Sequence, residues 1–251
     1  MPKPGYTTSA VFGFARHCFV PQSSMFHFDI ITIFPKIFDS YLNESILKRA
    51  RGKKLVQIAI HNLRDFSSDK KHKKVDDKPY GGGAGMVLMA EPILLAVSHT
   101  AKRKALASPP LRPSVQSANR TKIVILSAKG KQFTQKLAHD WLKRYKRIVL
   151  ISGRYEGIDE RVVKALRAEE VSIGPYVLTD GDAAAMVVIS SLTRLIPGVI
   201  DWKSLEEESH WNLFLKKEQR DVTVGKGLEY PHYTRPEVFL YGGKKYRVPK
   251  I

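Results

Sequence analysis

The sequence predicts an α/β fold in which helices cover a mainly parallel sheet. Two observations carry this prediction. Short apolar runs alternate with helix-periodic segments along most of the chain, and three of these runs are followed at once by glycine or small polar residues. Because open α/β sheets bind ligands in the loops at the carboxyl ends of their strands, we expect the functional residues in those loops.

Five extended segments are predicted from apolar runs that are bounded by turn residues. Pro35 follows the first run, and proline cannot continue a central strand. The predicted strands cover residues 28–33, 55–60, 123–126, 148–151 and 171–178.

Five helices are predicted from apolar residues spaced three and four apart. Gly52 is expected to close the first helix, and Pro197-Gly198 to stop the last. The predicted helices cover residues 36–50, 91–103, 132–145, 158–168 and 183–195.

The predicted α/β domain covers residues 25–199. Residues 1–24 contain no acidic residue and no periodic pattern, so we interpret them as an extension ahead of a natural start at Met25. Residues 104–120 hold three prolines and are expected to form a solvated loop. The polar residues 200–212 indicate a flexible linker or lid, and residues 213–251 a short basic tail.

The charge balance indicates a polyanionic partner. The 251 residues include 42 Lys and Arg against 24 Asp and Glu, a formal net charge of +18. No basic amphipathic helix accompanies an apolar anchor, so nucleic acid is favoured over an anionic membrane surface or a ribosomal neighbour. No apolar run is long enough to span a membrane. The single cysteine, Cys18, excludes an internal disulfide and fits a reducing cytoplasm.

Three loops follow predicted strands, at residues 127–130, 152–157 and 179–182. Their glycines let the backbone approach a ligand closely. Neither a P-loop nor a dinucleotide fingerprint is present. The loops therefore suit an adenosine-type ligand held by main-chain hydrogen bonds, with simple tight turns as the alternative.

The most specific motif is Gly153-Arg154-Tyr155-Glu156-Gly157-Ile158-Asp159-Glu160-Arg161. Further motifs stand in order at residues 28–35, 75–86, 172–178, 194–199 and 231–237. Together they resemble the TrmD family of tRNA (guanine-N1)-methyltransferases, which belongs to the SPOUT methyltransferases. The resemblance covers roughly residues 26–240 and implies an α/β trefoil knot, an exception to the rule that chains avoid threading.

The resemblance also implies the cofactor, the target and the assembly. S-adenosylmethionine is the expected methyl donor, guanosine 37 of tRNA the expected target, and a cytoplasmic homodimer with shared active sites the expected form. A magnesium ion is expected to assist. The positions that match the family's cofactor site are Leu126, Ser127, Gly153, Tyr155, Glu156, Ile173, Gly174, Tyr176, Leu178 and Gly181.

The expected reaction needs a base, because guanine N1 carries a proton at neutral pH. In the family the base is an aspartate before a serine in the lid, and an arginine assists. Arg194 matches the arginine, and Glu208, with Glu207 as the fallback, takes the place of the aspartate. The alternative is that these acids only solvate a linker.

An RNA-binding surface is expected beside the glycine cluster at residues 81–85. Lys73 and Lys74 would neutralise phosphates, and Asp76 and Asp77 would accept hydrogen bonds from guanine. A solvated charged surface is the alternative. The resemblance adds His232 and Arg235 to the RNA side. No second Cys/His pair stands at ligand spacing, so no structural metal is expected.

Two departures from the family leave rival functions open. Asp180 and Asp182 replace a more usual glycine and glutamate, and residues 213–251 cover only the beginning of the family's helical C-terminal domain, as a truncated tRNA-binding segment would. The rivals are a catalytically impaired fragment that binds RNA or cofactor, and a methyltransferase for another RNA base.

Overall fold

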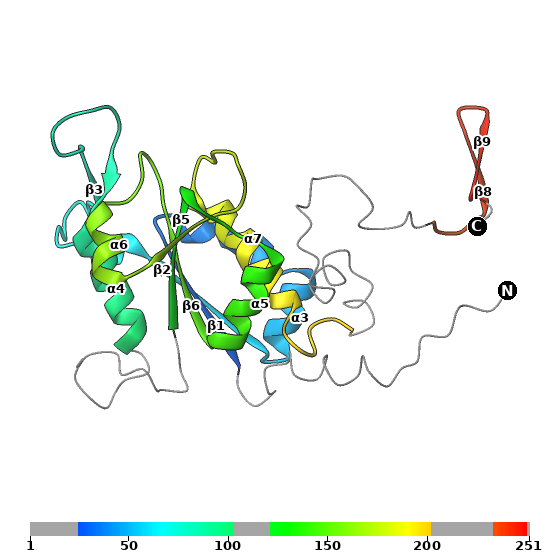
Figure 1. The fold of residues 1–251 in the computed structure, drawn as a ribbon, viewed down its shortest axis with the longest axis horizontal. Helices are drawn as coiled ribbons and strands as arrows, with labels where there is room; N and C mark the ends of the chain where they lie inside the picture. The colour runs from blue at the N-terminus through cyan, green and yellow to red at the C-terminus, as the bar shows by residue number, and fades with distance from the viewer. Residues whose placement is uncertain (1–24, 103–120, 202–232, 250–251) are drawn as a thin grey trace. The chain divides into compact units, whose positions relative to one another are not determined.

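The computed structural model describes residues 25–102, 121–201 and 233–249. The chain divides into two units, Met1–Trp202 and Lys203–Ile251. The first unit contains a five-stranded sheet and a small hairpin, and the second contains another hairpin (Figure 1).

The five-stranded sheet is parallel throughout, which confirms the predicted fold class. Its strand order is β2-β1-β6-β5-β7. The strands are β1 (Phe26–Thr32), β2 (Val56–Asn62), β5 (Thr121–Gln132), β6 (Arg147–Ser152) and β7 (Glu169–Ser172). All but one residue of β1 are buried, because a parallel sheet is covered on both faces.

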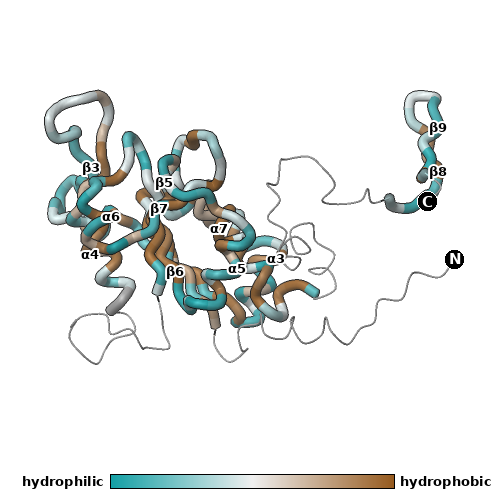
Figure 2. Tube along the Cα trace, viewed as in Figure 1, coloured by the Kyte–Doolittle hydropathy of each residue, from teal (hydrophilic) through white to brown (hydrophobic). Residues whose placement is uncertain are grey.

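Helices pack on both faces of this sheet (Figure 1). One face carries α4 (Ala90–Lys102) and α6 (Glu160–Leu166), and the other carries α3 (Ser45–Gly52), α5 (Gln135–Arg144) and α7 (Gly181–Arg194). The apolar residues lie along the strands and the inner helix faces (Figure 2). The apolar contacts between the sheet and the helices on each of its faces fix the positions of the central strands and of their carboxyl ends.

The predicted helix over residues 36–50 is wrong as a single element. The structure has η2 (Pro35–Phe38), α2 (Asp39–Leu42) and then α3. Asn43 interrupts the helix, since its side chain donates a 2.6 Å hydrogen bond back to the Asp39 carbonyl. Ser45 then adopts a left-handed backbone with φ of 50°. An asparagine that satisfies a helix-end carbonyl in this way competes with helix continuation.

The predicted loop at residues 127–130 is also wrong, because β5 continues through it. Leu126 and Lys131 both pair with Val171 of β7, so the register shifts between them. Gly130 lies against the β7 backbone, where a Cβ atom would overlap the Val171 amide. This irregular stretch brings β5 into contact with β7 twice.

Two short hairpins complete the described structure. The first pairs β3 (Asp76–Asp77) with β4 (Val87–Leu88), and the second pairs β8 (Val238–Tyr241) with β9 (Lys244–Arg247). No helix in the described ranges is long and apolar enough to cross a membrane. The expected extension at 1–24, the loop at 104–120 and most of the lid at 200–212 lie outside the described residues.

Candidate functional site

A pocket of about 450 Å³ opens beyond the carboxyl ends of β5, β6 and β7. It is lined by residues 125–129 of β5, by the loop at 153–158, and by residues 170–173, 176–181 and 184. Small-molecule pockets typically measure roughly 300–1,000 Å³ and occupy this edge of an α/β sheet. The pocket therefore has the size and the place of a ligand site.

Nine of the ten expected cofactor positions line this pocket. They are Leu126, Ser127, Gly153, Tyr155, Glu156, Ile173, Tyr176, Leu178 and Gly181. The tenth, Gly174, supports the lining, since its carbonyl accepts a 2.8 Å hydrogen bond from Ser172 Oγ. The Tyr176 ring packs so closely on Gly174 that a Cβ atom there would overlap the ring.

Backbone hydrogen bonds fix the loops of the pocket against each other. The Gly181 amide donates to the Gly153 carbonyl at 2.8 Å, which joins the start of α7 to the end of β6. Gly157 donates to the Arg154 carbonyl at 3.1 Å and closes a tight turn. Tyr155, inside this turn, has a left-handed backbone with φ of 59°. This strained residue persists only because its surroundings hold it.

The charged side chains of the pocket leave one carboxylate unpaired. Lys129 approaches Glu170 at 3.4 Å, and Arg154 pairs with Asp180 at 3.1 Å. Glu156 has no cationic partner among the described residues. Within a strongly basic chain, this pocket therefore offers a free negative charge that suits a cationic ligand.

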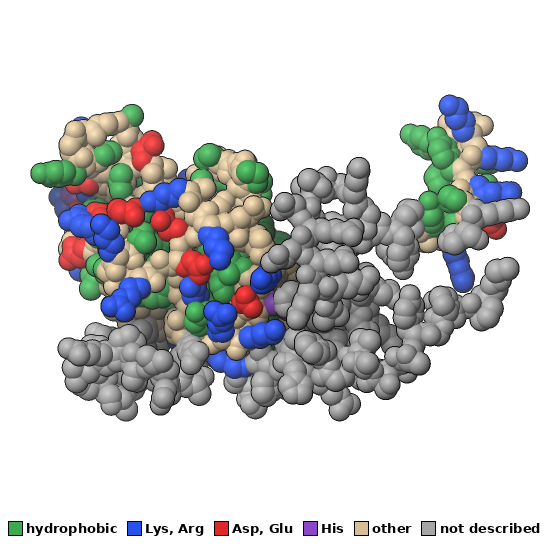
Figure 3. Space-filling model, viewed as in Figure 1, with side chains coloured by type: hydrophobic (Ala, Val, Ile, Leu, Met, Phe, Trp, Pro, Cys, Tyr) green, Lys and Arg blue, Asp and Glu red, His purple; other side chains and the backbone are tan. Residues whose placement is uncertain are grey.

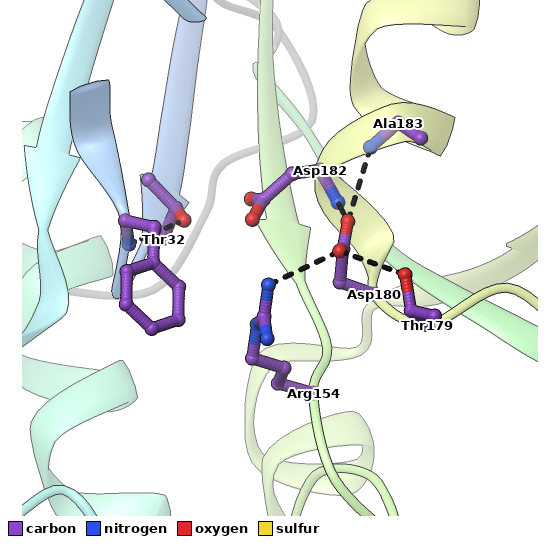
Figure 4. Close-up of polar contacts among 7 residues, drawn as sticks. Thr32, Arg154, Thr179, Asp180, Asp182 and Ala183 are labelled. Carbon is purple, nitrogen blue, oxygen red and sulfur yellow. Dashed lines mark hydrogen bonds and ion pairs between the residues drawn. The ribbon is translucent and has the colours of Figure 1, made fainter. Parts of the chain in front are cut away.

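Three charged residues near this site were named in the sequence motifs but given no role there. Arg154 and Asp180 line the pocket, and Asp182 lies buried beside them (Figure 4). Asp180 caps α7, since its Oδ1 accepts from the amides of Asp182 at 2.9 Å and Ala183 at 3.3 Å. Arg154 and Asp180 carry opposite charges and lie in two loops that are expected at the same edge of the sheet. This combination is the signal that could have predicted their ion pair.

The expected catalytic residues are not assembled within the described chain. Arg194 is the last residue of α7, and a helical rise of 1.5 Å per residue puts it about 20 Å from Gly181 at the pocket. Arg194 does not line the pocket. Glu208 and Glu207 lie outside the described residues.

The expected RNA-side residues form ion pairs on the β3–β4 hairpin and the loop before it. Lys74 Nζ lies 3.0 Å from Asp77, and Lys73 Nζ lies 3.5 Å from Asp65. The hydrogen bond from Lys74 lowers the pKa of Asp77. Asp76 is half-buried and has no ion pair among the described residues. Arg235 is exposed in the second unit, and His232 lies outside the described residues.

The hairpin is joined to the pocket by backbone contacts. The Glu156 amide donates to the Met86 carbonyl at 3.0 Å, and the Leu88 amide donates to the Gly157 carbonyl at 3.0 Å. Gly85 has φ of 78°, and a Cβ atom there would overlap the Glu156 carboxylate. The glycine cluster thus sets where Glu156 lies.

The surface carries charges of both signs. Figure 3 shows Lys and Arg side chains interspersed with acidic ones on the visible face of the first unit. In the described ranges, no three His, Cys, Asp or Glu side chains gather as a metal site. His61 instead bonds Asp29 inside the sheet at 2.8 Å.

Comparisons with known proteins point to one family. The family model "tRNA (Guanine-1)-methyltransferase TrmD" matches residues 26–251. A tRNA (guanine-N(1)-)-methyltransferase of Thermomicrobium roseum is 51% identical over 212 residues, which is 84% of this chain and 69% of that protein. One of Clostridioides difficile is 42% identical over 84% of this chain and 80% of its own length. The crystal structure of tRNA (m1G37) methyltransferase from Aquifex aeolicus superposes with a TM-score of 0.64 at 31% identity, over 90% of this chain and 81% of that one.

Proposed function

The chain belongs to the TrmD family of tRNA (guanine-N1)-methyltransferases, and we propose that its pocket binds S-adenosylmethionine for methylation of N1 of guanosine 37 in tRNA. The observation that carries the proposal is the pocket beyond β5, β6 and β7, which gathers nine of the ten matched cofactor positions. We place the enzyme in the cytoplasm, where its tRNA substrate is found.

The pocket fits the proposed cofactor. When bound, S-adenosylmethionine supplies a methyl group on a positively charged sulfur. The unpaired Glu156 carboxylate complements that charge, and glycine at 181 lets the start of α7 approach the backbone at Gly153 closely enough to form the wall of the pocket. The hydrogen bond between those two glycines supports the further proposal that the pocket loops interlace as a trefoil knot.

The base in the proposed reaction is Glu208. Its carboxylate takes the N1 proton of guanine, which turns a poor nucleophile into a competent one. Arg194 stabilises the negative charge that develops on the guanine O6. Replacing Glu208 by Gln should abolish methylation but leave donor binding intact; full activity of E208Q would shift the assignment to Glu207.

We propose that the enzyme is a homodimer whose active site is shared. Arg194 lies about 20 Å from the pocket of its own chain. In the proposed dimer, one copy therefore supplies the pocket and the second copy supplies Arg194. The apolar side chains of Ile37, Tyr41 and Val187 are exposed on η2, α2 and α7, and α7 contacts η2. Mixing R194A with a variant that is inactive because its pocket is changed should restore part of the activity, since a mixed dimer then contains one intact site, whereas a site built within one chain would stay inactive.

The basic loop and the hairpin beside the pocket are proposed to bind the tRNA. Lys73 and Lys74 contact phosphates together with Arg235 and His232, and Asp76 and Asp77 accept hydrogen bonds from the guanine edge. The described residues do not fit a resident magnesium site, so no step of the proposal depends on one. Addition of a chelator tests separately whether magnesium stimulates turnover.

The decisive experiment measures transfer of labelled methyl groups to two tRNA transcripts, one with guanosine and one with adenosine at position 37. The proposal expects transfer to the guanosine transcript only. Equal transfer to both would keep the methyltransferase and overturn the target base. Donor binding without transfer to either would identify a protein that binds the cofactor but does not catalyse.

A further inference from the structure

An ion pair bridges the two loops that form the mouth of the pocket. Arg154 belongs to the loop after β6, and Asp180 precedes α7, yet Arg154 Nη2 lies 3.1 Å from Asp180 Oδ2 (Figure 4). The two residues also form an antiparallel backbone bridge. Their side chains are only 26% and 14% exposed, so the pair is partly shielded from solvent. Screening by water and salt is correspondingly weaker than for a surface pair.

The Arg154 guanidinium is held from a second side. Its Cζ atom lies 4.4 Å from the centre of the Phe34 ring, two residues after the end of β1. The same Asp180 carboxylate caps α7 through its other oxygen, Oδ1. The Asp180 side chain therefore links the start of α7 to the loop at 153–157, and the Arg154 side chain links that loop to the segment that follows β1.

Two unpartnered polar groups lie in the same cluster. Among the described residues, Arg154 Nε and both carboxylate oxygens of Asp182 are buried without a hydrogen-bond partner. Figure 4 shows the Asp182 carboxylate turned toward Thr32 and Arg154 reaching toward Asp180. Buried donors and acceptors without a hydrogen-bond partner, such as Arg154 Nε and the Asp182 oxygens, are uncommon in folded proteins. Asp182 itself does not line the pocket, so these groups mark a cluster beside the pocket whose polar atoms are not all paired.

We propose that Arg154 is a positioning residue for the cofactor pocket and that Asp180 holds it in place. The inference rests on the function proposed above. Arg154 acts through its neighbours in the chain, since the turn from Arg154 to Gly157 contains the strained Tyr155 and the pocket carboxylate Glu156. The ion pair anchors the first residue of this turn, so the pocket lining is set before the cofactor binds.

Two substitutions separate this role from helix capping. Asp180→Asn keeps the cap, because asparagine caps helices as well as aspartate does, but removes the charge that faces Arg154. Arg154→Met removes the same pair from the other side. Each should weaken S-adenosylmethionine binding on the order of tenfold in isothermal titration calorimetry, and the double variant should be no weaker than either single one. The Michaelis constant for the donor should rise, while turnover at saturating donor is retained.

Arg161→Ala is the matched control. Arg161 forms a 2.6 Å ion pair with Asp159, but its side chain is 82% exposed and does not line the pocket. Donor binding by this variant should equal that of the wild type. Unchanged binding by D180N and R154M, or strictly additive losses, would overturn the positioning role alone. Failure of the wild-type chain to bind the donor would overturn the proposed function and this inference with it.

Discussion

Two buried aspartates in the same unit have opposite surroundings. Asp29 lies within β1, 2% exposed, and receives hydrogen bonds from His61 at 2.8 Å and from Arg147 at 2.5 Å. Asp182 lies at the start of α7, 1% exposed, and neither of its oxygens has a partner among the described residues. The interior of the sheet satisfies its buried charge, whereas the edge that carries the pocket does not.

The pKa values of the two carboxyls diverge accordingly. Burial alone would raise the pKa of Asp29, but the bonds from His61 and Arg147 outweigh it and hold that pKa below its ordinary value. Burial raises the pKa of Asp182, and the nearby hydroxyls of Ser152 and Thr32 offset this only in part. The comparison teaches that the buried carboxylate inside the sheet is firmly paired, whereas the one at the start of α7, beside the pocket, is not.

The largest expected effect comes from breaking the satisfied cluster. Asp29→Ala leaves His61 and Arg147 without their shared partner, so the free energy of unfolding should fall by about 3–5 kcal/mol in urea titrations. Because the pKa of Asp29 is lowered in the folded state, its contribution is present above the ordinary value of 3.8 and is lost as pH falls through the folded value. The exposed Asp39→Ala is the control, with a change below about 0.5 kcal/mol. An equal, small loss for both variants would contradict the cluster's role.

The next largest effect is expected at the pocket edge. A Cβ atom at Gly181 would lie 2.8 Å from the Gly153 amide and 3.0 Å from the Ser152 Cα, so the two loops have to separate. Gly181→Ala should cost about 1–3 kcal/mol of stability and weaken donor binding as well.

Gly52→Ala provides the matched control for Gly181→Ala. Nothing lies within 4 Å of a Cβ atom at Gly52, at the end of α3. This variant should be neutral or slightly stabilised, since alanine favours helix, and should keep full donor affinity. If Gly181→Ala bound the donor equally well, the close approach of the two loops would not shape the pocket.

A smaller effect of opposite sign is expected for Asp182. Its raised pKa means that it favours the folded state most below 3.8 and that this contribution is lost as pH rises through the folded value. Asp182→Asn removes the buried charge, so it should stabilise the protein by about 1–2 kcal/mol at neutral pH and by less in acid. Thermal melts across pH measure this. Asp29→Asn should destabilise the protein under the same conditions. If both variants changed the stability in the same direction, the two aspartates would not have opposite surroundings.

The sequence was sufficient to predict elements that depend on local pattern. The parallel sheet and its central strands follow from apolar runs and the turn residues that bound them, whereas the residues that line the pocket were predicted from the family resemblance. Contacts between distant segments were not predictable. Lys131 of β5 pairs with Val171 of β7 after the register shift. Asp29 accepts hydrogen bonds from His61 and Arg147, which are 32 and 118 residues away in the sequence. A single sequence carries no signal for such pairings, because they depend on which strands become neighbours.

The smallest expected effect compares a helix cap far from the pocket with the cap at its edge. Thr134 Oγ1 accepts a 3.2 Å hydrogen bond from the Leu137 amide at the start of α5 and does not line the pocket. Thr134→Ala should cost about 0.5–1 kcal/mol and leave donor affinity unchanged. Asp180→Ala removes a cap and the ion pair to Arg154 together, so it should lower both stability and donor affinity. Thermal melts and calorimetry on this pair of variants decide whether a cap at the pocket edge serves binding. If both variants lost stability alone, Asp180 would be an ordinary cap, and the unsatisfied groups around it would have no bearing on the pocket.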